Sequence, residues 1–182
     1  CGVACSRNLR RLETVKQCAE VNSCLRVVAS FGTITVGRTQ SLHAVDLRGD
    51  LVQVEWSVEG TGTIDAEGVL TAPPDPTTTV AVATASDGRR ASLRIDVVAA
   101  PQSPVIVVGA TAMTTGRRYN VSALPNPANS SVTWSVNNAR LLSSSNAMSV
   151  DLEAGGVGSL TIVAEAKNAA GDSAIPTVQR LD

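Results

Sequence analysis

Residues 52–58 read Val-Gln-Val-Glu-Trp-Ser-Val, and residues 132–136 read Val-Thr-Trp-Ser-Val. In both stretches apolar and polar residues alternate around a tryptophan. A period of two places one set of side chains on each face of a β-strand. A sheet with one packed face and one solvated face has this pattern. Because the motif recurs after about 80 residues, the sequence predicts two all-β units in tandem, each with one core tryptophan, Trp56 and Trp134.

The composition fits β-sandwiches and argues against two kinds of partner. The chain has 182 residues with 15 basic and 16 acidic side chains, a formal net charge of −1. Nucleic-acid binding requires a basic surface, so we expect no nucleic-acid partner. The aromatic residues are Phe31, Trp56, Tyr119 and Trp134, so the cores must be aliphatic and an aromatic sugar platform is not expected. No apolar run approaches the ~18 residues of a membrane-spanning helix.

The first 30 residues have a different pattern, which predicts a helix over roughly residues 6–21. Ser6 is a suitable N-cap. Apolar residues then recur at helical spacing, accompanied by basic ones: Leu9, Leu12, Val15 and Ala19, with Arg7, Arg10, Arg11 and Lys16. The basic residues have two interpretations. They could attract anionic lipid headgroups, or they could simply form a solvated face or contact a partner protein.

All four cysteines, Cys1, Cys5, Cys18 and Cys24, lie in this segment. Such clustering is typical of a local staple or anchor in an oxidising compartment. A continuous helix would hold Cys5 and Cys18 about 20 Å apart, so they would not pair. Cys18 and Cys24 flank the helix end and are the preferred disulfide pair.

The first β unit is predicted over residues 31–99 and the second over residues 105–182, joined by a proline-containing linker, 100–104. In the first unit the strand 39–45 has Leu42 and Ala44 facing inward. Asp87-Gly88 is a strong signal for a two-residue hairpin loop. In the second unit Met148, Val150 and Leu152 alternate with polar residues, and Leu160, Ile162 and Ala164 alternate in the next strand.

Few residues are of a type that performs chemistry. His43, the single histidine, lies between two inward-facing positions and is therefore predicted to be an ordinary surface residue. Asp46, Asp50 and Glu55 are candidate calcium ligands, but their spacing does not match a calcium loop, and solvated loop charges are the simpler interpretation. We therefore predict no metal site, no cofactor, no small-molecule substrate and no enzymatic activity.

Several stretches carry a family resemblance. In the first unit these are Thr35-Val-Gly37, Val54-Glu-Trp-Ser-Val58, the run from Gly62 to Pro73, and Ile95-Asp-Val-Val98. Through them residues 33–98 resemble bacterial immunoglobulin-like (Ig-like) domains. The second unit has Tyr119-Asn-Val121, Val132-Thr-Trp-Ser-Val136 and the run from Leu160 to Asn168. Through these, residues 105–179 resemble a PKD-type or related Ig-like domain. The resemblance implies spacers, stalks or binding modules on bacterial or phage surfaces.

The pair Cys1-Gly2 resembles the start of a mature bacterial lipoprotein, in which the cysteine carries lipid. This resemblance implies lipidation at Cys1 and an exported protein tethered to the outer membrane or cell surface. With Cys1 lipidated, Cys5, Cys18 and Cys24 allow one intramolecular disulfide. Without lipid, four cysteines allow two disulfides in three connectivities.

Together these features predict two tandem Ig-like β-sandwiches behind a short helical, cysteine-containing segment. The predicted function is that of a non-enzymatic structural or scaffolding lipoprotein, with spacer or docking modules that engage other envelope or surface-complex proteins. One alternative is a subunit of a surface filament, pilus or phage particle held by protein contacts and disulfides. Another is an accessory domain of a secreted hydrolase. The fold does not choose among these functions.

Overall fold

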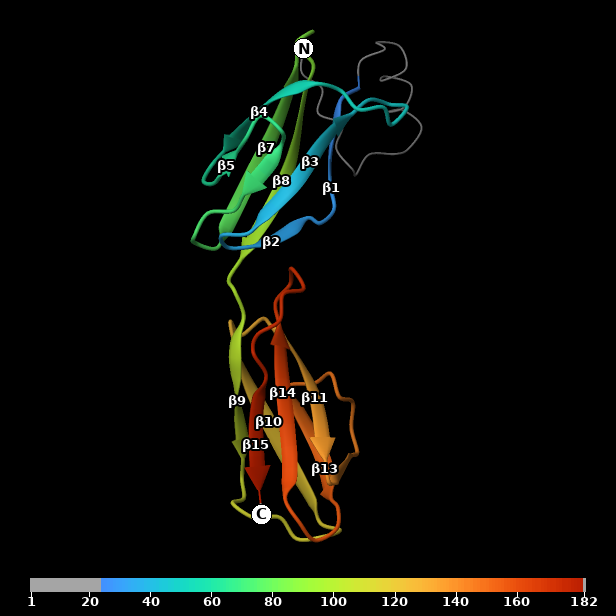
Figure 1. Ribbon diagram of the computed structural model, residues 1–182, viewed down its shortest axis with the longest axis vertical. Helices are drawn as coiled ribbons and strands as arrows, with labels where there is room; N and C mark the ends of the chain where they lie inside the picture. The colour runs from blue at the N-terminus through green and yellow to red at the C-terminus, as the bar shows by residue number, and fades with distance from the viewer. Residues whose placement is uncertain (1–23, 182) are drawn as a thin grey trace. The chain divides into compact units, whose positions relative to one another are not determined.

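The computed structural model describes residues 24–181, which form fifteen β-strands and no helix (Figure 1). The all-β prediction is confirmed. The predicted helix over 6–21 lies outside the described residues, as do Cys1, Cys5 and Cys18. The chain divides into two compact units between Val98 and Ala99, here called unit 1 and unit 2. No helix in the described range is long and apolar enough to cross a membrane.

Unit 1 is a sandwich of two four-stranded sheets, with strand orders β1-β3-β6-β5 and β2-β8-β7-β4. Neighbouring strands are antiparallel, except that β2 runs parallel to β8. The strands are β1 (Arg26–Ala29), β2 (Thr33–Thr35), β3 (Thr39–Val45), β4 (Val54–Glu59), β5 (Thr63–Ile64), β6 (Val69–Thr71), β7 (Thr77–Ala85) and β8 (Arg90–Val98).

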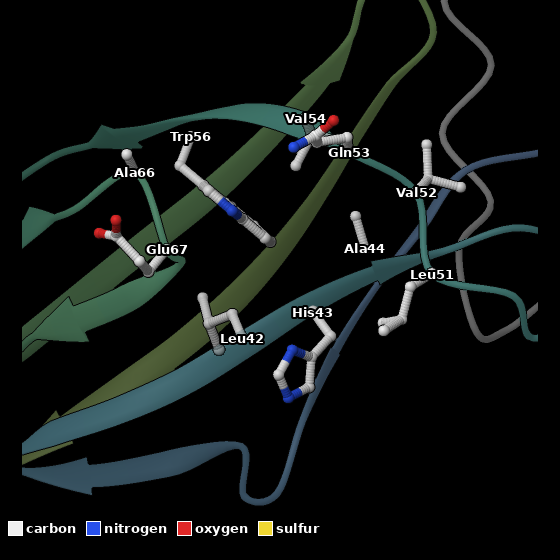
Figure 2. Close-up of a pocket in the computed structure, with 10 residues that line it drawn as sticks. All are labelled: Leu42, His43, Ala44, Leu51, Val52, Gln53, Val54, Trp56, Ala66 and Glu67. Carbon is white, nitrogen blue, oxygen red and sulfur yellow. The ribbon is translucent and has the colours of Figure 1, made fainter.

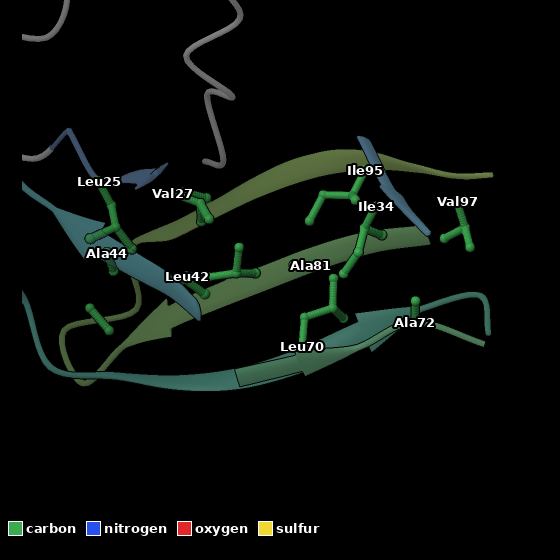
Figure 3. Close-up of a cluster of buried hydrophobic side chains, with 13 residues drawn as sticks. Leu25, Val27, Ile34, Leu42, Ala44, Leu70, Ala72, Ala81, Ile95 and Val97 are labelled. Carbon is green, nitrogen blue, oxygen red and sulfur yellow. The ribbon is translucent and has the colours of Figure 1, made fainter. Parts of the chain in front are cut away.

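The core of unit 1 is aliphatic and lies between the two sheets (Figure 3). Leu42, Leu70 and Ile95 are its largest fully buried side chains. Removing such a side chain from water contributes about 1.5–3 kcal/mol each. Leu42 and Ala44 face inward on β3, as their alternation predicts.

The first domain begins earlier than its predicted start at residue 31. Strand β1 pairs with β3 along its whole length, from Arg26 opposite Val45 to Ala29 opposite Leu42. Leu25 and Val27 belong to the buried core of unit 1. The predicted segment 1–30 therefore ends in residues of the sandwich itself. A strand of four residues is too short to show a clear period, and this one directly follows the cysteine-rich segment.

One type of turn reverses the chain four times, in both units. The carbonyl of its first residue accepts a hydrogen bond from the N–H of a glycine three positions later, and that glycine has a positive φ. The turns run from Asp46 to Gly49, from Asp65 to Gly68, from Ala85 to Gly88 and from Asn168 to Gly171.

The hairpin between β7 and β8 is one of these turns, and it differs from the prediction of a two-residue loop. The Ala85 N–H donates to the Arg89 carbonyl, so three residues, 86–88, form the loop. Gly88 has a φ of 86°, in the left-handed region. This is the three-residue hairpin in which a left-handed glycine follows a type I turn. Asp87-Gly88 thus predicted the position of the hairpin correctly and its loop length wrongly.

Unit 2 has a four-stranded sheet, β12-β13-β10-β9, packed on a three-stranded sheet, β11-β14-β15. The strands are β9 (Gln102–Val108), β10 (Arg118–Asn126), β11 (Ser131–Asn137), β12 (Ala139–Leu141), β13 (Ser149–Ala154), β14 (Leu160–Lys167) and β15 (Thr177–Leu181). Its buried core is separate from that of unit 1 and contains Val121, Trp134, Val150, Leu152 and Ile162.

One predicted boundary of unit 2 needs correction, and one residue of an alternating run is exposed. The predicted linker 100–104 is too long, because β9 already begins at Gln102 and Pro104 is buried. Met148 continues the alternation of Val150 and Leu152 in the sequence, but it lies just before β13 and is 43% exposed. The Met148 carbonyl accepts the Ala123 N–H at 2.8 Å, so neither alternation nor pairing with β10 guarantees burial at the end of a strand.

Candidate functional site

The two tryptophan strands occupy corresponding places in their units. β4 and β11 are each the edge strand of a sheet, and each has a single antiparallel neighbour among the described residues, β7 for β4 and β14 for β11. Trp56 lies opposite Ala83, and Trp134 lies opposite Ala164. The same sequence motif is therefore present in two environments that can be compared directly.

In unit 2 the chain covers its own tryptophan strand. The backbone N–H of Trp134 donates to the Ser145 carbonyl at 2.8 Å, and its indole Nε1–H donates to the Ala147 carbonyl at 2.6 Å. Trp134 is only 3% exposed and belongs to the core. The stretch between β12 and β13 thus satisfies both donors of Trp134 and closes the edge of β11.

In unit 1 no segment of residues 24–98 covers the tryptophan strand in this way. Trp56 packs against the core but is only partly buried, unlike the fully buried residue that the alternation predicts. Its indole N–H donates no hydrogen bond to any group among residues 24–181. The apolar residues of β4, which are Val54, Trp56 and Val58, are all half-buried. Strand β5, which packs against β4 from the other sheet, has only two residues and cannot shield them.

Gly68 determines how closely the Trp56 indole approaches the opposite sheet. A Cβ atom at Gly68 would lie 2.7 Å from the Leu42 carbonyl oxygen and 2.9 Å from the Trp56 Nε1. Only glycine fits there, and its φ of 83° also favours glycine. The turn from Asp65 to Gly68 therefore packs directly against the Trp56 indole.

A groove of about 430 Å³ opens beside this indole (Figure 2). Residues of β3, of β4 and the stretch leading into it, and of the Asp65–Gly68 turn line the groove: Leu42, His43, Ala44, Leu51, Val52, Gln53, Val54, Trp56, Ala66 and Glu67. Leu42 and Ala44 are buried, whereas Leu51 is 76% exposed and Glu67 is exposed at the turn. The groove therefore combines apolar walls with a polar rim and an indole donor.

The part of the chain that builds the open edge is acidic. Residues 49–88 contain seven carboxylates and no lysine, arginine or histidine; the carboxylates are Asp50, Glu55, Glu59, Asp65, Glu67, Asp75 and Asp87. Glu59 is paired with Arg90 at 2.8 Å. Glu55 is exposed on β4 and Glu67 is exposed on the groove rim, and neither has an ion pair among the described residues. The edge and the groove thus present uncompensated negative charge.

The residues weighed for calcium do not form a site. Among residues 24–181 no group of three potential metal ligands comes together. The Asp46 Oδ1 instead accepts the backbone N–H groups of Arg48 at 2.8 Å and Asp50 at 3.0 Å. Desolvation raises the pKa of Asp46. The hydrogen bonds from the Asp50, Arg48 and Gly49 N–H groups, together with the positive charge of Arg48, outweigh desolvation and hold the pKa below its ordinary value. Asp46 is a turn residue.

His43 and the cysteines take different places. His43 is exposed on β3, between the buried Leu42 and Ala44, as the alternation predicts, and it also borders the groove. Cys24 is disulfide-bonded, and the cysteine that it bonds lies outside the described residues. The preferred pairing of Cys18 with Cys24 stays a prediction. The groove was missed by sequence reasoning, although the run of carboxylates from Asp50 to Asp87 was readable as a signal.

The comparisons with known proteins concern the fold. No protein-family model and no curated protein matches the sequence. Among solved structures, murine CEACAM1b matches at 12% identity with a TM-score of 0.50, covering 87% of this chain and 99% of its own. A structure of a mouse coronavirus receptor-binding domain complexed with its murine receptor matches at 12% identity with a TM-score of 0.51, covering 87% and 96%. With the sheet topology, these matches show two tandem Ig-like β-sandwiches.

Proposed function

We propose that this chain is a non-enzymatic, exported structural protein whose two Ig-like units serve as spacer and docking modules in a cell-surface or envelope complex. The observation that carries the proposal is the contrast between the two tryptophan strands. Unit 2 is closed by its own chain, whereas unit 1 presents an open edge strand beside an apolar groove. An open edge of this kind is suited to binding another protein.

The assignment of the units is part of this proposal. We take unit 1 as a bacterial Ig-like domain and unit 2 as a PKD-type or related Ig-like domain, on the sequence stretches quoted above. One of the matched structures is a complex between two proteins, a mouse coronavirus receptor-binding domain and its murine receptor. Binding between proteins is also the use that we propose for this chain. Partners would be other surface proteins rather than nucleic acids or small-molecule substrates.

The proposed anchor is a lipid on Cys1, supported by the resemblance of Cys1-Gly2 to mature lipoproteins. Several acyl chains on one cysteine hold a protein on a membrane firmly, whereas one chain does so only marginally. In cells that make the full protein, we expect Cys1→Ser to move it from the membrane fraction to the soluble fraction. Cys5→Ser is the matched control, since it removes a thiol but keeps Cys1. Equal membrane partition of wild type and Cys1→Ser would contradict the anchor.

A filament, pilus or phage subunit is the second candidate, and its basis is the number of cysteines. Residues 1–24 contain four cysteines, so the disulfide at Cys24 leaves two more that could bond another chain. If either of these two cysteines joins two chains, electrophoresis without reductant will show multimers that collapse to one band on reduction. A single monomer band under both conditions would exclude disulfide-linked assembly. An accessory domain of a secreted hydrolase remains the third candidate, and a catalytic domain in the same polypeptide would support it.

A further inference from the structure

We propose that the free edge of β4 and the adjoining groove are the docking site for an extended, basic strand of a partner protein. The inference rests on the proposed docking function and deepens it by naming the surface and the chemistry of the occupant. The partner strand would extend the β2-β8-β7-β4 sheet by one member. Its lysine or arginine side chains would lie beside Glu55 on the outer face of the sheet. Its apolar side chains would enter the groove, where Glu67 adds negative charge at the rim.

The hydrogen-bonding groups of β4 are in place for such an addition. In any β-strand, residues whose side chains share a face also direct their N–H and C=O groups to the same side. In unit 2 the Trp134 N–H points away from β14 and donates to the Ser145 carbonyl. Strand β4 is antiparallel to β7 as β11 is to β14, and its tryptophan also faces inward. The backbone N–H and C=O groups of Val54, Trp56 and Val58 therefore point away from β7, to the free edge.

Unit 2 also shows what an occupant does chemically. There, carbonyl oxygens two positions apart, those of Ser145 and Ala147, accept the backbone and indole N–H groups of one tryptophan. The segment of unit 2 that supplies these acceptors is bent. A strand beside β4 would supply an acceptor to the Trp56 backbone N–H, and a bend at its end would bring a second carbonyl to the indole. The Trp56 indole donor, unused among residues 24–181, would then be satisfied.

Among residues 24–181, strand β4 lacks most of the usual protection against edge pairing, and the protection that it has is the charge of Glu55 and Glu59. Natural edge strands are shielded by proline, lysine, a bulge, short length or a covering loop. The sequence Val-Glu-Trp-Ser-Val-Glu of β4 contains neither proline nor lysine, and its pairing with β7 is regular over all six residues. The other edge strands of unit 1 have two to four residues: β1, β2 and β5. β4 is thus the longest edge of unit 1 within residues 24–181.

Charge decides which strand fits. Glu59 and Asp87 are ion-paired with Arg90 and Arg89. Glu55 on β4 and Glu67 at the groove rim are exposed and have no ion pair among residues 24–181, so an acidic strand would be repelled. A second copy of this chain is a poorer occupant for the same reason. An antiparallel pair of β4 strands centred on Ser57 would place Glu55 of each copy opposite Glu59 of the other. A strand that alternates apolar and basic residues matches both the groove and Glu55.

The test uses the full wild-type chain and its two indole N–H signals in nuclear magnetic resonance, one for each unit. The probe is a capped seven-residue peptide of alternating lysine and valine, and its glutamate–valine counterpart is the matched control. We expect the lysine peptide to shift the Trp56 indole signal saturably and to slow exchange of the Trp56 amide. The Trp134 signal should stay unchanged. The glutamate peptide should bind at least ~10-fold more weakly, as should the lysine peptide to the double variant Glu55→Lys/Glu67→Lys.

Each contrary result would overturn the inference. A Trp56 signal that ignores the lysine peptide would remove the docking site, and equal binding by the double variant would remove the charge argument. Protection of the Trp56 amide that grows with protein concentration would identify a second copy as the occupant. Protection already present in the dilute monomer would show that the chain covers this edge itself. None of these outcomes bears on the Cys1 anchor, which membrane fractionation tests separately.

Discussion

Replacing Gly68 with alanine should destabilise unit 1 by about 2–4 kcal/mol, because the methyl group meets both backbone strain and a crowded contact. A left-handed φ costs alanine about 1–2 kcal/mol, and the reduced entropy of the unfolded chain returns about 0.4–1 kcal/mol. The added Cβ would lie 2.7 Å from the Leu42 carbonyl oxygen and 2.9 Å from the Trp56 Nε1. Overpacking of this kind costs about 1–3 kcal/mol.

Gly88→Ala is the matched control for this substitution. Gly88 ends the same type of turn, its φ is 86° against 83° for Gly68, and nothing lies within 4 Å of a Cβ placed there. Only the backbone terms remain, so we expect a loss of about 1 kcal/mol or less. The difference between the two variants, about 2 kcal/mol, isolates the contact with the Trp56 indole and the Leu42 carbonyl.

The assay is equilibrium unfolding in urea, followed by tryptophan fluorescence. Each unit contains one tryptophan, so Trp56 reports on unit 1 and Trp134 on unit 2. Gly68→Ala should lower the midpoint of the Trp56 transition and shift the native emission of Trp56, while the Trp134 transition stays in place. Equal midpoints for Gly68→Ala and Gly88→Ala would refute the close support of the indole by Gly68.

Three further predictions follow from single contacts. Thr79→Val should cost unit 1 about 1 kcal/mol, since the buried Thr79 hydroxyl donates to the Thr61 carbonyl at 2.6 Å; urea unfolding measures this. Ser130→Ala should leave unit 2 as stable or about 1 kcal/mol more stable, because the Ser130 Oγ is buried without a partner among the described residues; a lower midpoint would contradict this. The Arg89 backbone N–H, partly opposed by desolvation and aided by the Arg89 side chain, lowers the pKa of Asp87. Ionised Asp87 therefore stabilises unit 1 at a pH above the unfolded pKa near 3.8, and this stabilisation is lost as the pH falls through the lower folded pKa. Asp87→Asn should be less stable than wild type at neutral pH, and the two unfolding midpoints should converge in acid.

Most of the strand positions were predictable because their side chains alternate with a period of two. The strand 39–45, the hairpin at Asp87-Gly88 and the inward faces around Val150 and Ile162 all follow from that pattern. Strand β1 was missed because four residues carry too little periodicity. The β7–β8 loop length was wrong because the register of a hairpin depends on its turn geometry, which two residue names do not specify.

The candidate site was less predictable than the fold. Both tryptophans have the same sequence surroundings, so alternation assigned both to the core. Trp134 is buried because the stretch containing Ser145 and Ala147 returns to cover it. Trp56 is only half-buried because β5 is short and no described segment lies along β4. These are contacts between residues distant in the chain, and a local pattern does not contain them.

The amino-acid sequence by itself determined the all-β class, the tandem repeat, the aliphatic cores and the acidic character of residues 49–88, because each is a property of composition or of local period. Only the tertiary structure decided which tryptophan is covered, which edge is open and why Gly68 must be glycine. Those outcomes depend on which loop packs against which strand, and packing of that kind is settled by shape and hydrogen bonding across the whole sandwich.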